Sequence, residues 1–261
     1  MNMETSARSF ASKIDEAIAI SAPVFISGVL EKLLQRKRIS YSTFGEDLML
    51  ESIFKRHEFH TKEILKFSYI DIGAWRPIRG SNTYKFYKQG IRGTVVEPNS
   101  NLSKVWRAVR PKDQFLPYAC GNDEEVQFHQ FTKLAQSNTA NANFAQEISS
   151  NQEIMVSKTS VVKALKLDEI IEKHLNLFPG NFILDLDIEG DDSKVLESFS
   201  FSKILRPAVI LVEDHFRPNL VTSPIHSVLS KNEYRLTGRS TITSIYVDSH
   251  SSLTSSLYPI L

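Results

Sequence analysis

The stretch LDLDIEGDDS, residues 184–193, is the most concentrated set of chemically competent side chains in the sequence. It places five carboxylates within eight residues, namely Asp185, Asp187, Glu189, Asp191 and Asp192. Because the stretch begins as an apolar strand, alternation predicts that the side chains of residues 185, 187 and 189 share one face. The last two acids precede a helical pattern that starts near Ser193, and we expect them to cap that helix at its positive N-terminus.

A second polar group, Glu213, Asp214 and His215, follows the apolar pattern AVILV. If the two strands are neighbours in a sheet, their ends converge on one pocket. We expect Asp187 or His215 to act as a base that accepts a hydroxyl proton. Carboxylate oxygens also bind divalent cations such as Mg²⁺, so Asp187, Glu189 and Glu213 form an alternative set of metal ligands.

A third candidate is the loop after SYIDI, where Asp71 and Gly73 follow a buried strand. A strand, a glycine turn and an acid at the end of the next strand, Glu97, match the outline of an NAD site. The detail does not match, because a pyrophosphate needs several glycines for close approach to backbone N–H groups, and Pro77 removes one donor. Asp71 would also repel the two phosphate charges.

S-adenosylmethionine reverses this electrostatic sign, because its sulfonium and ammonium groups are cationic and it carries no phosphate. Asp71 then attracts the ligand, one glycine suffices, and Glu97 suits the two ribose hydroxyls. The turn after the third strand is placed to meet the adenine. We therefore expect the cofactor to contact Asp71, Gly73, Ala74, Glu97, Pro98, Gly121, Asn122 and Asp123.

The strands and helices that position these residues alternate along the chain. Strands are predicted at 67–72, 93–97, 114–119, 126–131, 181–188, 208–214, 234–236 and 243–247, and helices at 44–56, 82–88, 99–109, 193–199 and from about 224. This pattern predicts a doubly wound α/β sheet, mostly parallel with an antiparallel last strand. Residues 134–153 are rich in Ser, Asn and Gln, and we expect a mobile loop or lid there.

Composition excludes several classes of protein. The 261 residues carry a net charge of +1 and no basic stripe interleaved with aromatic residues, so we expect no nucleic-acid partner. The sole cysteine, Cys120, excludes an internal disulfide and a zinc site built from cysteines. Together with the lack of a signal-peptide pattern, this suggests a cytoplasmic protein.

Residues 1–40 are expected to form a helical extension, and residues 41–261 a single domain. The apolar run at 17–30 is shorter than the about 20 residues that span a bilayer, so we expect no transmembrane segment. We favour helical pieces that pack on the domain or on a second copy of the chain, in a homo-oligomer. Contact with a membrane surface is the alternative, because basic residues follow the run.

Six segments together resemble the FkbM-type methyltransferases, a family of class I S-adenosylmethionine-dependent O-methyltransferases. They are YSTFGEDLML (41–50), YIDIGAWRPIRGSNT (69–83), GIRGTVVEP (90–98), LKLDEII (165–171), LDLDIEGDDSKVL (184–196) and RPAVILVE (206–213). The resemblance implies a Rossmann-like methyltransferase sheet with the cofactor on Asp71, Gly73 and Glu97.

The resemblance also implies a hydroxyl acceptor, such as a sugar of a polysaccharide, a glycolipid or a related natural product. Arg76, Arg79 and Asn82 surround the cofactor loop, and we expect them to contact this acceptor, the arginines through a phosphate or carboxylate. Two alternatives stay open at this point, an NAD-dependent sugar oxidoreductase and a non-catalytic binding scaffold. The three differ in whether they bind S-adenosylhomocysteine, NAD or neither.

Overall fold

The computed structural model describes residues 38–132, 135–152, 155–214 and 222–257. The chain divides into two compact units, Met1–Ile39 and Ser40–Leu261. The expected helical extension over residues 1–40 thus lies almost entirely outside the described residues, as does the candidate base His215. Within the described ranges, no helix is both long enough and apolar enough to cross a membrane.

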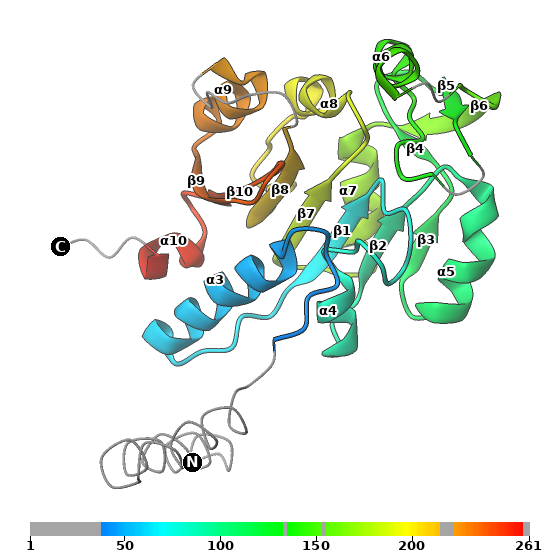
Figure 1. The fold of residues 1–261 in the computed structure, drawn as a ribbon. Helices are drawn as coiled ribbons and strands as arrows, with labels where there is room; N and C mark the ends of the chain where they lie inside the picture. Colours follow the sequence, from blue (N-terminus) through cyan, green and yellow to red (C-terminus); the bar gives the residue numbers. More distant parts are fainter. Residues whose placement is uncertain (1–37, 133–134, 153–154, 215–221, 258–261) are drawn as a thin grey trace, which may run out of the picture. The chain divides into compact units, whose positions relative to one another are not determined.

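A seven-stranded sheet forms the centre of the second unit (Figure 1). Its strands are, in spatial order, β3 (Gln114–Leu116), β2 (Gly93–Val96), β1 (Ser68–Ile72), β7 (Phe182–Leu186), β8 (Val209–Glu213), β10 (Thr243–Asp248) and β9 (Tyr234–Arg239). The strands from β3 to β8 in this order are parallel, and β10 is antiparallel to both of its neighbours. The predicted doubly wound sheet, mostly parallel with an antiparallel last strand, is confirmed.

Helices cover both faces of this sheet (Figure 1). The face that presents Ile70 and Ile72 is covered by α7 (Leu167–Leu175), α8 (Asp192–Ser198) and α9 (Pro224–Lys231). The face that presents Tyr69 is covered by α3 (Glu46–Thr61), α4 (Tyr84–Lys88) and α10 (Ser252–Leu257). On this second face, Val95 of β2 meets α5 (Ser103–Val109), which follows the short 3₁₀ helix η1 (Ser100–Leu102).

Burial on both faces explains why the central strands read as continuous apolar runs. In β1, Tyr69, Ile70 and Ile72 are all buried. The strand also holds two buried polar residues, Ser68 and Asp71. Asp71 lies on the same face as Tyr69, and its register partner on β7 is another buried acid, Asp185. Two neighbouring acids in the middle of a sheet need polar partners, and these partners organise the site.

A three-stranded sheet lies beyond the carboxyl ends of the parallel strands (Figure 1). Its strands are, in spatial order, β4 (Ala119–Cys120), β6 (Lys158–Leu165) and β5 (Glu125–Gln130). The single strand predicted over 114–119 is therefore wrong, since β3 ends at Leu116 and the chain joins the other sheet at Ala119. Pro117, which has no N–H to donate to a ladder, separates the two strands.

The predicted mobile loop over 134–153 is also wrong for most of its described length. Residues Ala142–Gln152 form helix α6, and its residues Ala145 and Ile148 are buried in a small core with Phe131. The spacing of three residues places these two side chains on one face. Most of the polar side chains whose abundance suggested a loop are exposed on this helix, namely Asn143, Gln146, Glu147, Ser150 and Asn151.

Candidate active site

A pocket of about 650 Å³ lies where the carboxyl ends of β1, β2 and β7 approach the three-stranded sheet. Gly73, Glu97 and Asp187 line it from the ends of the large sheet. Tyr118, Cys120 and other residues of the segment 118–140 line it from the opposite direction. This is the edge at which a doubly wound sheet binds its ligand.

Gly73 joins three strand ends. Its N–H donates to the carbonyl of Val96 at 3.0 Å, and the N–H of Asp187 donates to the carbonyl of Ile72 at 3.0 Å. Its φ of 78° lies in the left-handed region, and a Cβ at this position would overlap the carbonyl of Asp187. The chain therefore needs glycine here so that the loop can approach the backbone of residue 187.

Glu97 lies just past the end of β2 and is only 6% exposed. Its Oε2 accepts a hydrogen bond from the N–H of Trp75 at 2.9 Å, and its Oε1 accepts one from the N–H of Asn99 at 2.7 Å. Burial raises the pKa of Glu97 to about 7, although the two backbone hydrogen bonds lower it. Each oxygen has a further lone pair, so the ionised carboxylate can accept ligand hydroxyls.

Asp71 is not one of the residues that line the pocket. Its carboxylate accepts a hydrogen bond from the hydroxyl of Thr83. The two terminal nitrogens of Arg110 in turn donate to Thr83 Oγ1, each at 3.0 Å. Burial raises the pKa of Asp71, whereas the nearby charge of Arg110 lowers it. In this arrangement Asp71 anchors the far end of the loop that begins at Gly73.

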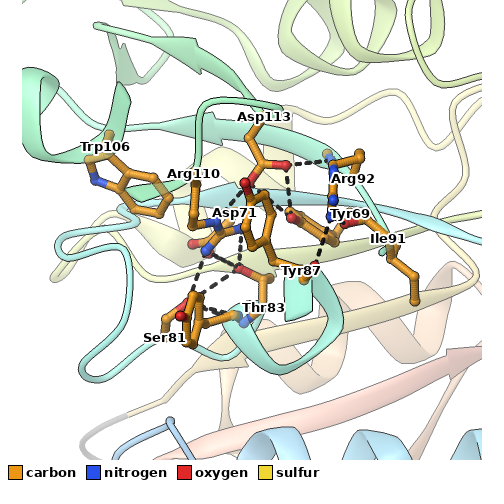
Figure 2. Close-up of polar contacts among 12 residues, drawn as sticks. Tyr69, Asp71, Ser81, Thr83, Tyr87, Ile91, Arg92, Trp106, Arg110 and Asp113 are labelled. Atoms are coloured by element: carbon orange, nitrogen blue, oxygen red, sulfur yellow. Dashed lines mark hydrogen bonds and ion pairs between the residues drawn. The ribbon is translucent and has the colours of Figure 1, made fainter. Parts of the chain in front are cut away.

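Arg110 is the centre of the buried polar cluster in Figure 2. The residue is 1% exposed, and its Nε donates to Asp113 at 2.7 Å. Asp113 also accepts from the hydroxyl of Tyr69 at 2.9 Å and from the N–H of Gly93 at 3.1 Å. Arg110 thus supplies positive charge to two buried carboxyls, those of Asp71 and Asp113.

Sequence reasoning did not identify Arg110. An arginine before a proline is common at the C-terminus of a helix and gives no specific signal. Arg110 also lies 39 residues after Asp71 in the sequence. The pairing of β1 with β2 and of β2 with β3 is what brings the two residues together.

Three carboxylates from the ends of β7 and β8 meet at one side of the pocket. Oxygen atoms of Asp187, Glu189 and Glu213 lie within 4.8 Å of one another. Burial raises the pKa of Asp187 well above its usual range, and the charges of Glu213 and Glu189 raise it further. We name these three residues the acidic triad. Such a group retains a proton or needs a cation nearby.

Asp185 is not part of the acidic triad, although alternation places it on the same face of the strand. Asn82 Nδ2 donates to Asp185 Oδ1 at 3.1 Å. Burial raises the pKa of Asp185 well above its usual range, and the neighbouring Asp71 raises it further. Asn82, expected as an acceptor contact, therefore binds a buried carboxyl and does not line the pocket.

The two acids predicted to cap α8 have other partners. Asp192 is buried and accepts hydrogen bonds from the N–H groups of Ile188 at 3.1 Å and Gly190 at 3.2 Å. Asp191 occupies the N-cap position, yet its side chain makes no capping hydrogen bond. The expectation of side-chain capping by Asp191 is therefore wrong, and Asp192 instead holds a tight turn in which Glu189 has a φ of 57°.

The segment before α6 is fastened to this turn. Thr139 Oγ1 donates to the carbonyl of Glu189 at 2.7 Å. Asn141 Nδ2 donates to the carbonyl of Gly190 at 3.1 Å and to Asp191 Oδ1 at 2.8 Å. Neither Thr139 nor Asn141 was identified from the sequence, because a Thr and an Asn in a polar stretch give no specific signal.

The turn at residues 121–123 does not line the pocket. The N–H of Gly121 donates to the carbonyl of Leu165 at 3.0 Å, and Asn122 Oδ1 accepts from Ser198 Oγ at 2.7 Å. Asp123 is exposed. The three residues immediately before the turn, Tyr118, Ala119 and Cys120, line the pocket instead.

Of the remaining predicted residues, one lines the pocket and the others lie elsewhere. Pro98 lines the pocket, whereas Ala74 is buried in the core cluster that contains Trp106. The guanidinium of Arg76 lies 5.0 Å from the ring centroid of Trp75, and Arg79 is exposed. Neither arginine lines the pocket.

Comparison with known proteins supplies the family. Residues 71–236 match the family model described as the methyltransferase FkbM domain. The chain belongs to the FkbM methyltransferase family. The region that matches the FkbM model contains Gly73, Glu97 and the acidic triad. No curated protein and no solved structure matched the chain.

Membership of the FkbM family identifies the protein as a methyltransferase and its sheet as Rossmann-like. The resemblance seen in the sequence is thereby confirmed. The pocket lies within the FkbM region at the edge where the sheet binds ligands, so it is the site at which a methyltransferase cofactor is expected.

Proposed function

We propose that this chain transfers a methyl group from S-adenosylmethionine to a hydroxyl of an acceptor. The acceptor that we propose is a sugar of a polysaccharide, a glycolipid or a related natural product. The observation that carries the proposal is the composition of the pocket. Its lining includes Glu97, a carboxylate suited to ribose hydroxyls, and two carboxylates of the acidic triad, Asp187 and Glu189. The low cysteine content favours a reducing compartment, and we propose a cytoplasmic location.

The pocket lining fits a cationic cofactor without phosphates. Asp187 and Glu189 line the pocket and supply negative charge, which attracts sulfonium and ammonium groups and repels a pyrophosphate. After Gly73 the loop continues with Ala74, Trp75 and Arg76, so it lacks the repeated glycines of a dinucleotide cradle. Glu97 would accept hydrogen bonds from the two ribose hydroxyls.

Asp187 is our candidate for the base. It lines the pocket, and its Oδ1 is buried without a hydrogen-bond partner among the described residues. When bound, the cofactor supplies an electrophilic methyl group on sulfur. As that methyl group would pass from sulfur to the acceptor oxygen, Asp187 would take the hydroxyl proton. Its raised pKa makes it a stronger base than an ordinary aspartate.

A divalent cation is the second candidate for the role of the acidic triad. The carboxylate oxygens lie within 4.8 Å of one another, so a small shift of these side chains would let them share one divalent cation such as Mg²⁺. A cation there would orient the acceptor hydroxyl and lower its pKa, and Asp187 would then be a ligand and not a base. The response of activity to EDTA distinguishes the two roles.

Calorimetric titration of the full chain with S-adenosylhomocysteine, and separately with NAD, tests the proposal. We expect S-adenosylhomocysteine to bind and NAD not to bind. Glu97→Gln should weaken binding about tenfold or more, because a hydrogen bond to a charged group is worth about 1.5–3 kcal/mol. Glu172→Gln, an exposed position on α7, is the control and should bind as the wild type does.

Preference for NAD would favour the sugar oxidoreductase that the sequence left open. Binding of neither ligand would favour the non-catalytic scaffold. Unchanged affinity for S-adenosylhomocysteine in Glu97→Gln would contradict the position that we give to the ribose.

A further inference from the structure

A second pocket, of about 980 Å³, adjoins the pocket lined by Gly73, Glu97 and Asp187, which we call the cofactor pocket. The two pockets share Gln136 and Glu189 in their linings. Within the acidic triad, Asp187 lines only the first pocket, Glu213 lines only the second, and Glu189 lines both. The acidic triad therefore lies at the junction of the two pockets. A methyl group transferred out of the first pocket would meet a molecule held in the second pocket at this point.

The lining of the second pocket has a definite chemistry. Amide and hydroxyl groups come from Thr43, Ser137 and Asn151, and apolar surface comes from the rings of Phe44 and Phe144. Three carboxylates, those of Glu147, Glu189 and Glu213, complete its polar part. Among the lining residues that the structure describes, there is no lysine or arginine.

We propose that the second pocket binds the methyl acceptor, and that the part of the acceptor inside it is uncharged and carries hydroxyl groups. This inference rests on the proposed function. It differs from the sequence-based expectation that Arg76 and Arg79 meet a phosphate or carboxylate of the acceptor, since neither arginine lines this pocket.

Charge is the reason for this selectivity. A phosphate or carboxylate would stand close to three acidic side chains, and like charges at such short range repel each other strongly when partly shielded from water. Hydroxyl groups, in contrast, donate hydrogen bonds to carboxylates and to the amide oxygens of Gln136 and Asn151. The two phenylalanine rings can cover the apolar face of such a molecule.

The experiment compares two probes with the same ring and different charge, methyl glucopyranoside and glucuronate. The full chain is first saturated with S-adenosylhomocysteine, and binding of each probe is followed by saturation-transfer NMR. We expect the neutral glycoside to bind at least tenfold more tightly than glucuronate.

A matched pair of variants on α6 tests the location. Glu147 lines the pocket and is exposed, so Glu147→Lys should be tolerated and should reduce the preference for the neutral probe at least fivefold. Gln146 is exposed on the same helix and does not line the pocket. Gln146→Lys introduces the same cationic side chain, although it changes the net charge by +1 where Glu147→Lys changes it by +2, and it should keep the wild-type preference.

The outcomes separate the inference from the proposed function. If the chain does not bind S-adenosylhomocysteine, the proposed function fails. If it binds S-adenosylhomocysteine and glucuronate binds as well as the glycoside, the inference about the acceptor is wrong while the proposed function stands. The inference is equally wrong if neither probe binds, or if both lysine variants change the preference alike.

Discussion

Gly73 lies against the main chain of Asp187 so closely that a Cβ on residue 73 would stand 1.6 Å from the carbonyl oxygen of residue 187. This contact ties the loop that borders the cofactor pocket to the strand end that carries the candidate base. The positions of Gly73 and Asp187 are therefore not independent, and the absence of a side chain at residue 73 sets the geometry at residue 187.

Gly73→Ala should destabilise the protein and impair cofactor binding. The left-handed φ of 78° alone costs a non-glycine residue about 1–2 kcal/mol, and displacement of the Asp187 backbone adds to this. We expect a total loss of unfolding free energy of about 3 kcal/mol or more, measured by urea denaturation.

The control for this substitution is Gly90→Ala. Gly90 has a φ of 94°, but a Cβ there would meet nothing within 4 Å. Gly90→Ala should lower the free energy of unfolding by only about 1–2 kcal/mol, the cost of the left-handed conformation. Equal losses in the two variants would show that the contact with Asp187 relaxes at little cost.

Arg110→Gln should destabilise the protein by about 3–5 kcal/mol, because it leaves Asp71 and Asp113 buried without their positive partner. The double variant Arg110→Gln with Asp113→Asn should recover part of this loss, since it removes one of the two uncompensated charges. Urea denaturation of both variants and of Asp113→Asn completes the cycle.

Arg107→Gln on the exposed side of α5 is the control and should change the unfolding free energy by less than about 0.5 kcal/mol. Additive losses at positions 110 and 113 would contradict the idea that the two side chains compensate each other's charge.

Burial raises the pKa of both Glu97 and Asp192 to about 7. The folded state therefore holds these two protons more tightly than the unfolded state, in which carboxyl pKa values lie near 4. Their contribution to stability is complete below about pH 4 and is lost as the pH rises through about 7. We expect the unfolding free energy to decrease between about pH 5 and pH 8, with a shallower slope in Glu97→Gln.

Affinity for S-adenosylhomocysteine should change in the opposite direction over the same interval, because the ionised Glu97 is the better acceptor for ribose hydroxyls. Calorimetric titrations at several pH values and constant ionic strength would follow it. A stability that increases with pH in this interval, or an affinity that does not, would contradict the assignment of a raised pKa to Glu97.

Asp187→Asn should lower the rate of methyl transfer about 100-fold or more, the usual contribution of a general base. If the residue is the base, EDTA should leave wild-type activity unchanged. If it is a metal ligand, EDTA should abolish activity and added Mg²⁺ should restore it. Full activity in Asp187→Asn, together with insensitivity to EDTA, would exclude both roles.

The central sheet could be predicted because its strands carry their own signal. Residues such as Ile183 and Leu184 belong to a run that is buried on both faces, and such a run is apolar whatever lies around it. Alternation along one strand could group Asp187 and Glu189 but also placed Asp185 with them, and the meeting with Glu213 depends on the pairing of β7 with β8.

The rest of the site depends on contacts between distant segments. Arg110 reaches Asp71 only after three strands have paired. Helix α6 was missed because only a few apolar positions, such as Ala145 and Ile148, define its buried face. The second pocket could not be predicted because it exists only after α6 has packed beside residues from the start of the domain, such as Phe44, and from the loop before β10, such as Ile242.

Helix α6 contributes Phe144, Glu147, Ile148 and Asn151 to the second pocket, while Gly73 and Glu97 of the first pocket lie just past the ends of two strands of the large sheet. The two halves of the site are thus encoded in separate stretches of the gene. On our proposal that the second pocket binds the acceptor, substitutions within this helix of 11 residues would change which molecule is modified and leave the methyl donor in place. On the same proposal, a graft of α6 between relatives would redirect the enzyme to a new acceptor.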